Sequence, residues 1–175
     1  ELLKKLIAEQ VSVYRRTNIV KSEKFSELIQ GAMNRYLNGM LTNEEVIQEL
    51  LKLAKEIADA NAEGEKLGLT ADELAFYDAL TKPQAIKDFY EHDELIAITK
   101  ELTDLLRKNR TIDWQKKESA RAGMRRLVKR LLKKHKYPPE GMDDAVQTVM
   151  SQCEMWTDNV TVSYTHLRAH ETAAN

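Results

Sequence analysis

The segment from Arg107 to Pro139 constrains the fold more than any other part of the chain. At about 100° per residue, its apolar side chains fall on one side of a helix, the spacing of a stripe that packs against a core. The stripe consists of Ala120, Met124, Leu127, Val128, Leu131 and Leu132. A basic row with helical spacing occupies the opposite side, and it consists of Arg126, Lys129, Arg130 and Lys133. The sequence therefore predicts a helix with one buried face and one basic, exposed face.

The ends of this helix also carry signals. Asp113 is the predicted N-cap, because a carboxylate before the first turn accepts hydrogen bonds from free backbone N–H groups. Tyr137-Pro138-Pro139 is predicted to end the helix, because a proline disfavours helical conformation in the residue before it. We expect Trp114, at the start of the apolar stripe, to anchor the core. The other side chains predicted to be buried core anchors are Leu127, Leu131, Phe76 and Leu50.

Charge is distributed unevenly along the chain. The segment 107–139 holds 13 of the 27 Lys and Arg residues but only 2 of the 28 acids, so it carries a net charge of +11 and the remainder −12. The basic row has three open interpretations: a solvated face, a contact with nucleic-acid phosphates, or a contact with an acidic protein surface. Arg121 lies at the edge of the apolar stripe, where an unpaired charge is costly, so we expect a buried ion pair with a carboxylate.

The rest of the chain predicts an all-α fold, one compact bundle of about seven helices with short loops spanning residues 1–159. Few stretches alternate as strands do, and Leu, Ala, Glu and Lys are abundant. Two capping boxes mark helix starts, in which a Thr hydroxyl and a Glu carboxylate satisfy free backbone donors. They are Thr42 with Glu45 and Thr70 with Glu73. Ser22 is the predicted cap of the second helix.

Residues 160–175 do not continue the apolar pattern and resemble translated adaptor or vector DNA. We therefore expect a non-native or disordered tail there. His166 and His170 have the spacing of paired metal ligands, but no third ligand is near, so we predict no metal site. The chain begins at Glu1 inside an amphipathic pattern, and we expect it to be a piece of a longer polypeptide.

Motifs for catalysis are missing from the sequence. It contains no GxxxxGK[ST], GxGxxG, GxSxG or HExxH motif, so we predict no catalytic residue and no cofactor for this chain. A single cysteine and the lack of a long apolar run lead us to expect a cytoplasmic protein with no membrane association.

Several strings resemble one protein family. The main ones are Asn109-Arg110-Thr111-Ile112-Asp113-Trp114, Val128-Lys129-Arg130-Leu131-Leu132 and Tyr137-Pro138-Pro139. Together with weaker strings between Leu2 and Met155, they resemble the C-terminal helical domain of the restriction (R) subunit of type I restriction-modification enzymes. One position departs from that pattern, because Lys136 stands where the family more often has Gly before Tyr-Pro-Pro.

The resemblance implies a parent enzyme that translocates and cleaves DNA, with ATP and Mg²⁺ as cofactors of the parent only. For this domain it implies docking of the motor subunit onto the methyltransferase and specificity subunits. The basic row, Arg126, Lys129, Arg130 and Lys133, is then the candidate contact with those partners. The alternative hypothesis is a nucleic-acid-binding helical module in which the same row contacts duplex DNA.

Overall fold

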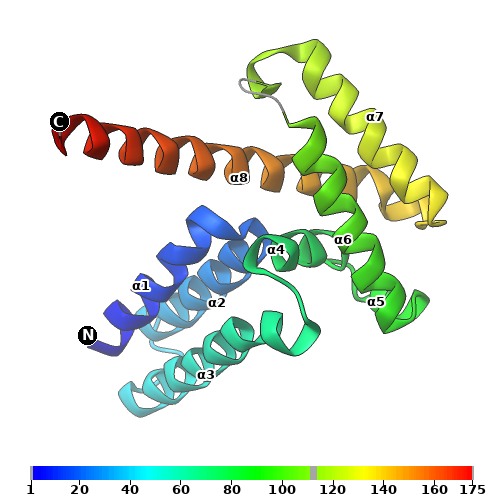
Figure 1. The fold of residues 1–175 in the computed structure, drawn as a ribbon. Coiled ribbons are helices and arrows are strands. Elements are labelled where there is room, and N and C mark those ends of the chain that lie inside the picture. The colour runs from blue at the N-terminus through cyan, green and yellow to red at the C-terminus, as the bar shows by residue number, and fades with distance from the viewer. Residues whose placement is uncertain (1, 111–113, 175) are drawn as a thin grey trace.

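The computed structural model describes residues 2–110 and 114–174, with side chains through Asp158 except that of Gln84. All regular structure in these ranges is helical, which confirms the all-α prediction (Figure 1). The helices are α1 (Leu2–Thr17), α2 (Ile19–Leu37), α3 (Asn43–Leu67), α4 (Ala71–Leu80), α5 (Gln84–Phe89), α6 (His92–Asn109), η1 (Trp114–Lys116), α7 (Glu118–Lys134) and α8 (Pro139–Ala174). The one-turn helix η1 and helix α5 were not predicted.

The helices form two groups (Figure 1). Each group encloses its own hydrophobic core. Helices α1–α3 enclose the smaller core, with Ile7, Phe25 and Leu50 among its buried side chains. The remaining helices build the larger core around α4, in which every side chain from Leu74 to Leu80 is buried. Because α4 packs against α6, α8 and α2, it holds the two groups of helices together.

Local capping explains most helix starts. The capping boxes at Thr42 and Thr70 are both present, with reciprocal hydrogen bonds to Glu45 and Glu73. The predicted cap at Ser22 was wrong. Helix α2 instead begins after Asn18, whose side-chain oxygen accepts a hydrogen bond from the N–H of Lys21 at 3.1 Å.

The predicted cap at Asp113 lies outside the described residues. Helix α7 begins at Glu118, and the preceding residue, Lys117, makes no side-chain capping bond.

Helix α7 ends in a Schellman motif. The N–H of Tyr137 donates to the carbonyl of Leu132 at 2.9 Å, and the N–H of Lys136 donates to that of Lys133 at 3.0 Å. This geometry requires a left-handed residue, and Lys136 has a φ of 60°. Tyr137 and Leu132 are both buried and supply the apolar contact that accompanies such an ending.

The predicted core anchors were mostly right. Leu50, Phe76, Trp114 and Leu131 are buried, whereas Leu127 is only partly buried and packs at the edge of the larger core. Helix α8 extends from Pro139 to Ala174. The prediction of a non-native tail over 160–175 falls on residues whose side chains are not described, and it stays a prediction. None of the helices in the described ranges is long and apolar enough to span a bilayer.

Candidate functional site: the basic face of helix α7

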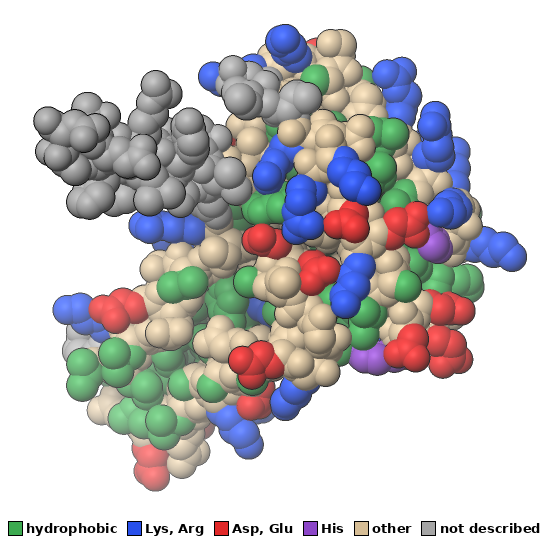
Figure 2. Space-filling model, in the orientation of Figure 1, with side chains coloured by type: hydrophobic (Ala, Val, Ile, Leu, Met, Phe, Trp, Pro, Cys, Tyr) green, Lys and Arg blue, Asp and Glu red, His purple; other side chains and the backbone are tan. Residues whose placement is uncertain are grey.

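The basic row forms one exposed face of helix α7, which we call the basic face. Arg126, Lys129, Arg130 and Lys133 are all exposed. On the other side of the helix, Met124, Val128, Leu131 and Leu132 are buried, which anchors the helix and fixes the direction of the basic face. Figure 2 shows Lys and Arg side chains gathered along this edge of the molecule.

Most cations next to the basic face are paired with carboxylates. Lys134 and His135 both contact Glu101, at 2.8 and 2.7 Å, and their hydrogen bonds hold the pKa of that carboxyl below its usual value. Arg125 lies 3.4 Å from Glu118.

The basic face itself is poorly neutralised. Lys129 is 3.7 Å from Asp143, whose side chain is 94% exposed, so this pair is weak. Within the described residues, no carboxylate pairs with Arg126, Arg130 or Lys133. The positive charge of the face is therefore available to a partner.

Arg121 makes the ion pair that the sequence suggested, although the pair is only half-buried. Its guanidinium lies 2.8 Å from Glu154 on α8, and the two side chains are 31% and 32% exposed. Arg121 also donates to the carbonyl of Gln115 at 3.3 Å. The pair fastens α7 to α8 at the edge of the core and is not itself free to bind a partner.

A shallow apolar groove runs beside the basic face. Its floor includes Trp114, Met124 and Leu127, and its rim includes Arg126 and Arg130. Trp114 is buried as predicted, with its indole N–H donating to Thr157 at 2.9 Å, so it is not a stacking platform for a base.

Gly123 also lines the groove, and no described atom outside the helix lies within 4 Å of where its Cβ would be. A glycine inside a helix lowers stability by about 0.5–1 kcal/mol relative to Ala. No neighbour in the described part of the chain requires its small size. The sequence signal that could have identified it is a lone Gly within a helical pattern.

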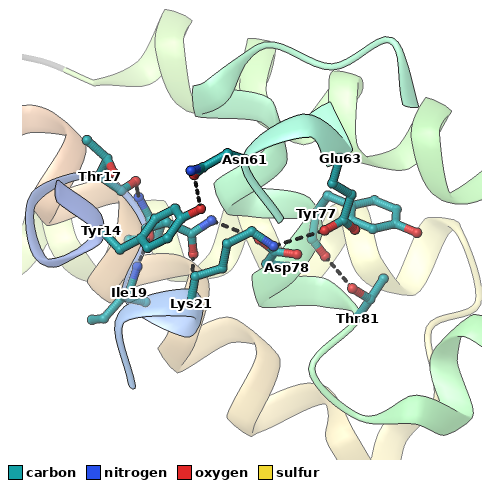
Figure 3. A network of polar contacts seen from close by, with 11 residues as sticks. Tyr14, Thr17, Ile19, Lys21, Asn61, Glu63, Tyr77, Asp78 and Thr81 are labelled. Carbon is teal, nitrogen blue, oxygen red and sulfur yellow. Dashed lines mark hydrogen bonds and ion pairs between the residues drawn. The ribbon is translucent and has the colours of Figure 1, made fainter. Parts of the chain in front are cut away.

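The sequence did not reveal a polar network between the two cores (Figure 3). The Nζ of Lys21 on α2 lies 3.0 Å from both Asp78 on α4 and Glu63 on α3. Asn18 donates to Asp78 at 2.8 Å. The side chain of Gln152 on α8 accepts from the N–H of Ile19 and donates to the carbonyl of Thr17. Five helices, α1–α4 and α8, are thus joined where α1 meets α2.

Burial sets the electrostatics of this network. The side chains of Lys21 and Asp78 are only 8% and 10% exposed. Burial alone would lower the pKa of Lys21, but the carboxylates of Asp78 and Glu63 raise it above its usual value of 10.5. Lys21 therefore stays charged. Because both carboxylate partners of Lys21 lie on helices of this chain, we interpret the network as structural. The basic face therefore remains the candidate functional site.

Metal binding has no support in the described side chains. No group of three His, Cys, Asp or Glu among them could hold an ion. His166 and His170, which the sequence had set aside, lie outside the described side chains.

Comparison with known proteins assigns the chain to a family. The family model for the C-terminal region of endonuclease subunits like that of the type I restriction enzyme HindI matches residues 1–159. The chain belongs to this family. The match agrees with the resemblance of the strings around Trp114 and Tyr137. No solved structure matches the chain.

Two relatives of the family show how much of a longer protein the chain represents. The type I restriction enzyme HindI endonuclease subunit of Haemophilus influenzae is 40% identical over 159 residues, which are 91% of this chain and 15% of the relative. A putative type I restriction enzyme MjaIXP endonuclease subunit of Methanocaldococcus jannaschii is 33% identical over 145 residues, 82% of this chain and 13% of the relative. The chain thus spans about a seventh of these relatives.

Proposed function

We propose that this domain docks the endonuclease subunit of a type I restriction-modification enzyme onto the methyltransferase and specificity subunits. The observation that carries the proposal is the basic face, where Arg126, Arg130 and Lys133 have no carboxylate partner among the described residues. Charges that are left unpaired on a rigid helix, while neighbouring cations are paired, suit an acidic partner surface.

The groove beside the basic face supports a protein partner. Its apolar floor and arginine rim offer a buried centre with a charged border, the usual arrangement of a protein interface. Gly123 leaves room for a partner backbone to approach α7. We expect an acidic, amphipathic element of the partner to lie along this groove.

We propose that ATP and Mg²⁺ are bound, and DNA translocated and cleaved, by the much longer part of the polypeptide that this chain does not cover. The chain's sequence has no nucleotide-binding loop, and we propose that the domain contributes to assembly. We also propose a cytoplasmic location for the assembled enzyme.

The test measures binding of the purified chain to the methyltransferase–specificity complex by biolayer interferometry. Changing the basic face to Gln at Arg126, Lys129, Arg130 and Lys133 should weaken binding at least about tenfold, since each lost charge contact costs a fraction of a kcal/mol or more. A matched control removes four exposed charges from the α1–α3 side: Lys4, Lys5, Lys55 and Lys66 to Gln. Equal losses in both variants would refute a specific role for the basic face.

Gly123→Leu gives an independent test of the groove. The change should leave the stability of the isolated chain unchanged or raise it, because Leu favours helix by nearly 1 kcal/mol over Gly and its Cβ meets no described atom within 4 Å. Binding to the complex should nevertheless fall. If the variant is more stable but binds less, unfolding cannot explain the weaker binding. Undiminished binding would show that the groove is not part of the interface.

Duplex DNA is the second candidate partner, favoured by the row of cations itself. If all four residues of the basic face met phosphates, log affinity would fall against log salt with a slope of about −3.6. The net charge of −12 outside residues 107–139 opposes this reading, because it repels a long duplex. Tight binding of the isolated chain to DNA, steep in salt and abolished by the Gln changes, would reverse our preference.

A further inference from the structure

Helices α1–α3 expose an unusual number of large apolar side chains at one end. Figure 2 shows hydrophobic side chains gathered over that end of the molecule, away from helix α7. The exposed side chains there, 50–75% accessible, are Leu2, Leu6, Leu37, Met40, Ile47 and Leu51. We call this set the apolar face. Soluble proteins seldom expose contiguous apolar surface of this kind unless something covers it.

The spacing of the apolar face indicates a second apolar stripe on these helices, separate from the stripe that packs in the core. Leu2 and Leu6 on α1 are four residues apart, as are Ile47 and Leu51 on α3. The small core beneath uses different positions, such as Ile7, Val11 and Leu50, which are buried. Each of these helices therefore has one apolar side facing its neighbours and another facing outward, the pattern of a helix that packs on two sides.

We propose that the apolar face packs against the polypeptide that precedes this domain in the full-length endonuclease subunit. The family model is that of a C-terminal region, and the HindI relative has 85% of its length outside the match. A preceding chain would enter at the start of α1, beside Leu2, which belongs to the apolar face itself (Figure 1).

Tethering makes this occupant a better fit than a separate molecule. A covalently linked neighbour is present at an effective concentration of about millimolar, so a modest apolar contact is enough to hold it. A second copy of the chain or a separate subunit would instead need an interface of about 800 Å² on each partner to bind stably. This inference rests on the family assignment and is independent of the docking role proposed for the basic face.

Cysteine labelling tests the proposal. Ile47→Cys places a thiol on the apolar face, and Phe89→Cys is the matched control, a 60% exposed apolar position on α5. The native Cys153 adds little background, because it is fully buried and burial raises its pKa to about 12. Labelling by a maleimide is read peptide by peptide with mass spectrometry, in the isolated chain and in the full-length subunit that contains it.

The expected result is fast labelling of both thiols in the isolated chain. In the full-length subunit, labelling at residue 47 should slow at least about tenfold and labelling at residue 89 should stay within about twofold, because the rate follows exposure of the thiolate. Equal rates at residue 47 in both proteins would overturn the proposal. Slowing only after the methyltransferase–specificity complex is added would make the face an assembly contact and would also overturn it.

Two further measurements complete the test. If labelling at residue 47 slows in the isolated chain at high concentration, and light scattering shows a doubled mass, the face pairs with a second copy and the proposal fails. In contrast, the double variant Ile47→Gln with Leu51→Gln should melt like the parent in the isolated chain, since both positions are exposed. In the full-length subunit it should speed proteolytic release of the domain, and an unchanged release rate would count against the proposal.

Discussion

Replacing Lys136 with Gly should stabilise the domain. Lys136 is the non-glycine residue with positive φ in the described part of the chain, and it occupies the left-handed position of the Schellman motif that ends α7. In that conformation an L-residue crowds its Cβ against the backbone, which costs about 1–2 kcal/mol.

The net gain is smaller than the strain that is removed. Gly also adds about 0.4–1 kcal/mol of conformational freedom to the unfolded chain, which favours unfolding. The difference predicts a gain of about 0.5–1 kcal/mol in the free energy of unfolding. The Lys136 side chain is exposed and makes no hydrogen bond or ion pair with the described residues. Its removal should therefore cost little free energy of unfolding.

Urea unfolding followed by far-ultraviolet circular dichroism measures this change. Lys136→Ala is the matched control, since it removes the same charge but keeps the Cβ, and it should lie within about 0.5 kcal/mol of the parent. The melting temperature of Lys136→Gly should rise by about 2–4 °C for each kcal/mol gained. A glycine variant no more stable than the alanine variant would show that residue 136 is not held in the left-handed conformation.

Two further changes test the cores. Leu131→Ala should lower the free energy of unfolding by about 2–5 kcal/mol, because it leaves a cavity under α7, and a loss below about 0.5 kcal/mol in a urea melt would show that the helix is rotated. Asp78→Ala should cost about 3 kcal/mol, because Lys21 would keep only Glu63, and adding Lys21→Met should recover much of the loss since no buried charge remains. A double variant as unstable as Asp78→Ala alone would refute this account.

The parts of the fold that the sequence predicted depend on local interactions. Apolar periodicity placed the long helices, and the boxes at Thr42 and Thr70 placed two starts, because a capping box involves only four consecutive residues. The start of α2 after Asn18 was predicted wrongly, because the local sequence does not mark it. One residue separates α1 from α2, so no loop composition marks the boundary, and Ser22 was the more obvious cap.

Helix α5 was missed because it is six residues long and has no room for a helical period. Among the described side chains of α5, Ile86 is the buried apolar residue, and a single buried residue shows no helical spacing in the sequence.

The candidate site was partly predictable. The phase of the basic face followed from the buried stripe, but its unpaired state did not, since Glu101 reaches Lys134 across 33 residues of sequence. Whether a surface cation is neutralised depends on such tertiary contacts. The apolar face was hidden for the converse reason, because Leu6 and Leu51 look like ordinary core positions until the bundle shows which side of each helix is free.

The sequence indicates that Asp78 needs a partner, but it does not identify that partner as Lys21. Asp78 is the single charge in the apolar run from Leu74 to Leu80, and a lone acid there must find a partner when the run is buried. The partner, Lys21, lies on another helix, α2, and the pairing limits how α2 and α4 can pack against each other. Apolar side chains between α2 and α4 would tolerate sliding, whereas we infer that an ion pair with an added hydrogen bond from Asn18 fixes one register. The basic face and the apolar face lie on the two helix groups that this register joins, so the network fixes the orientation of one face relative to the other.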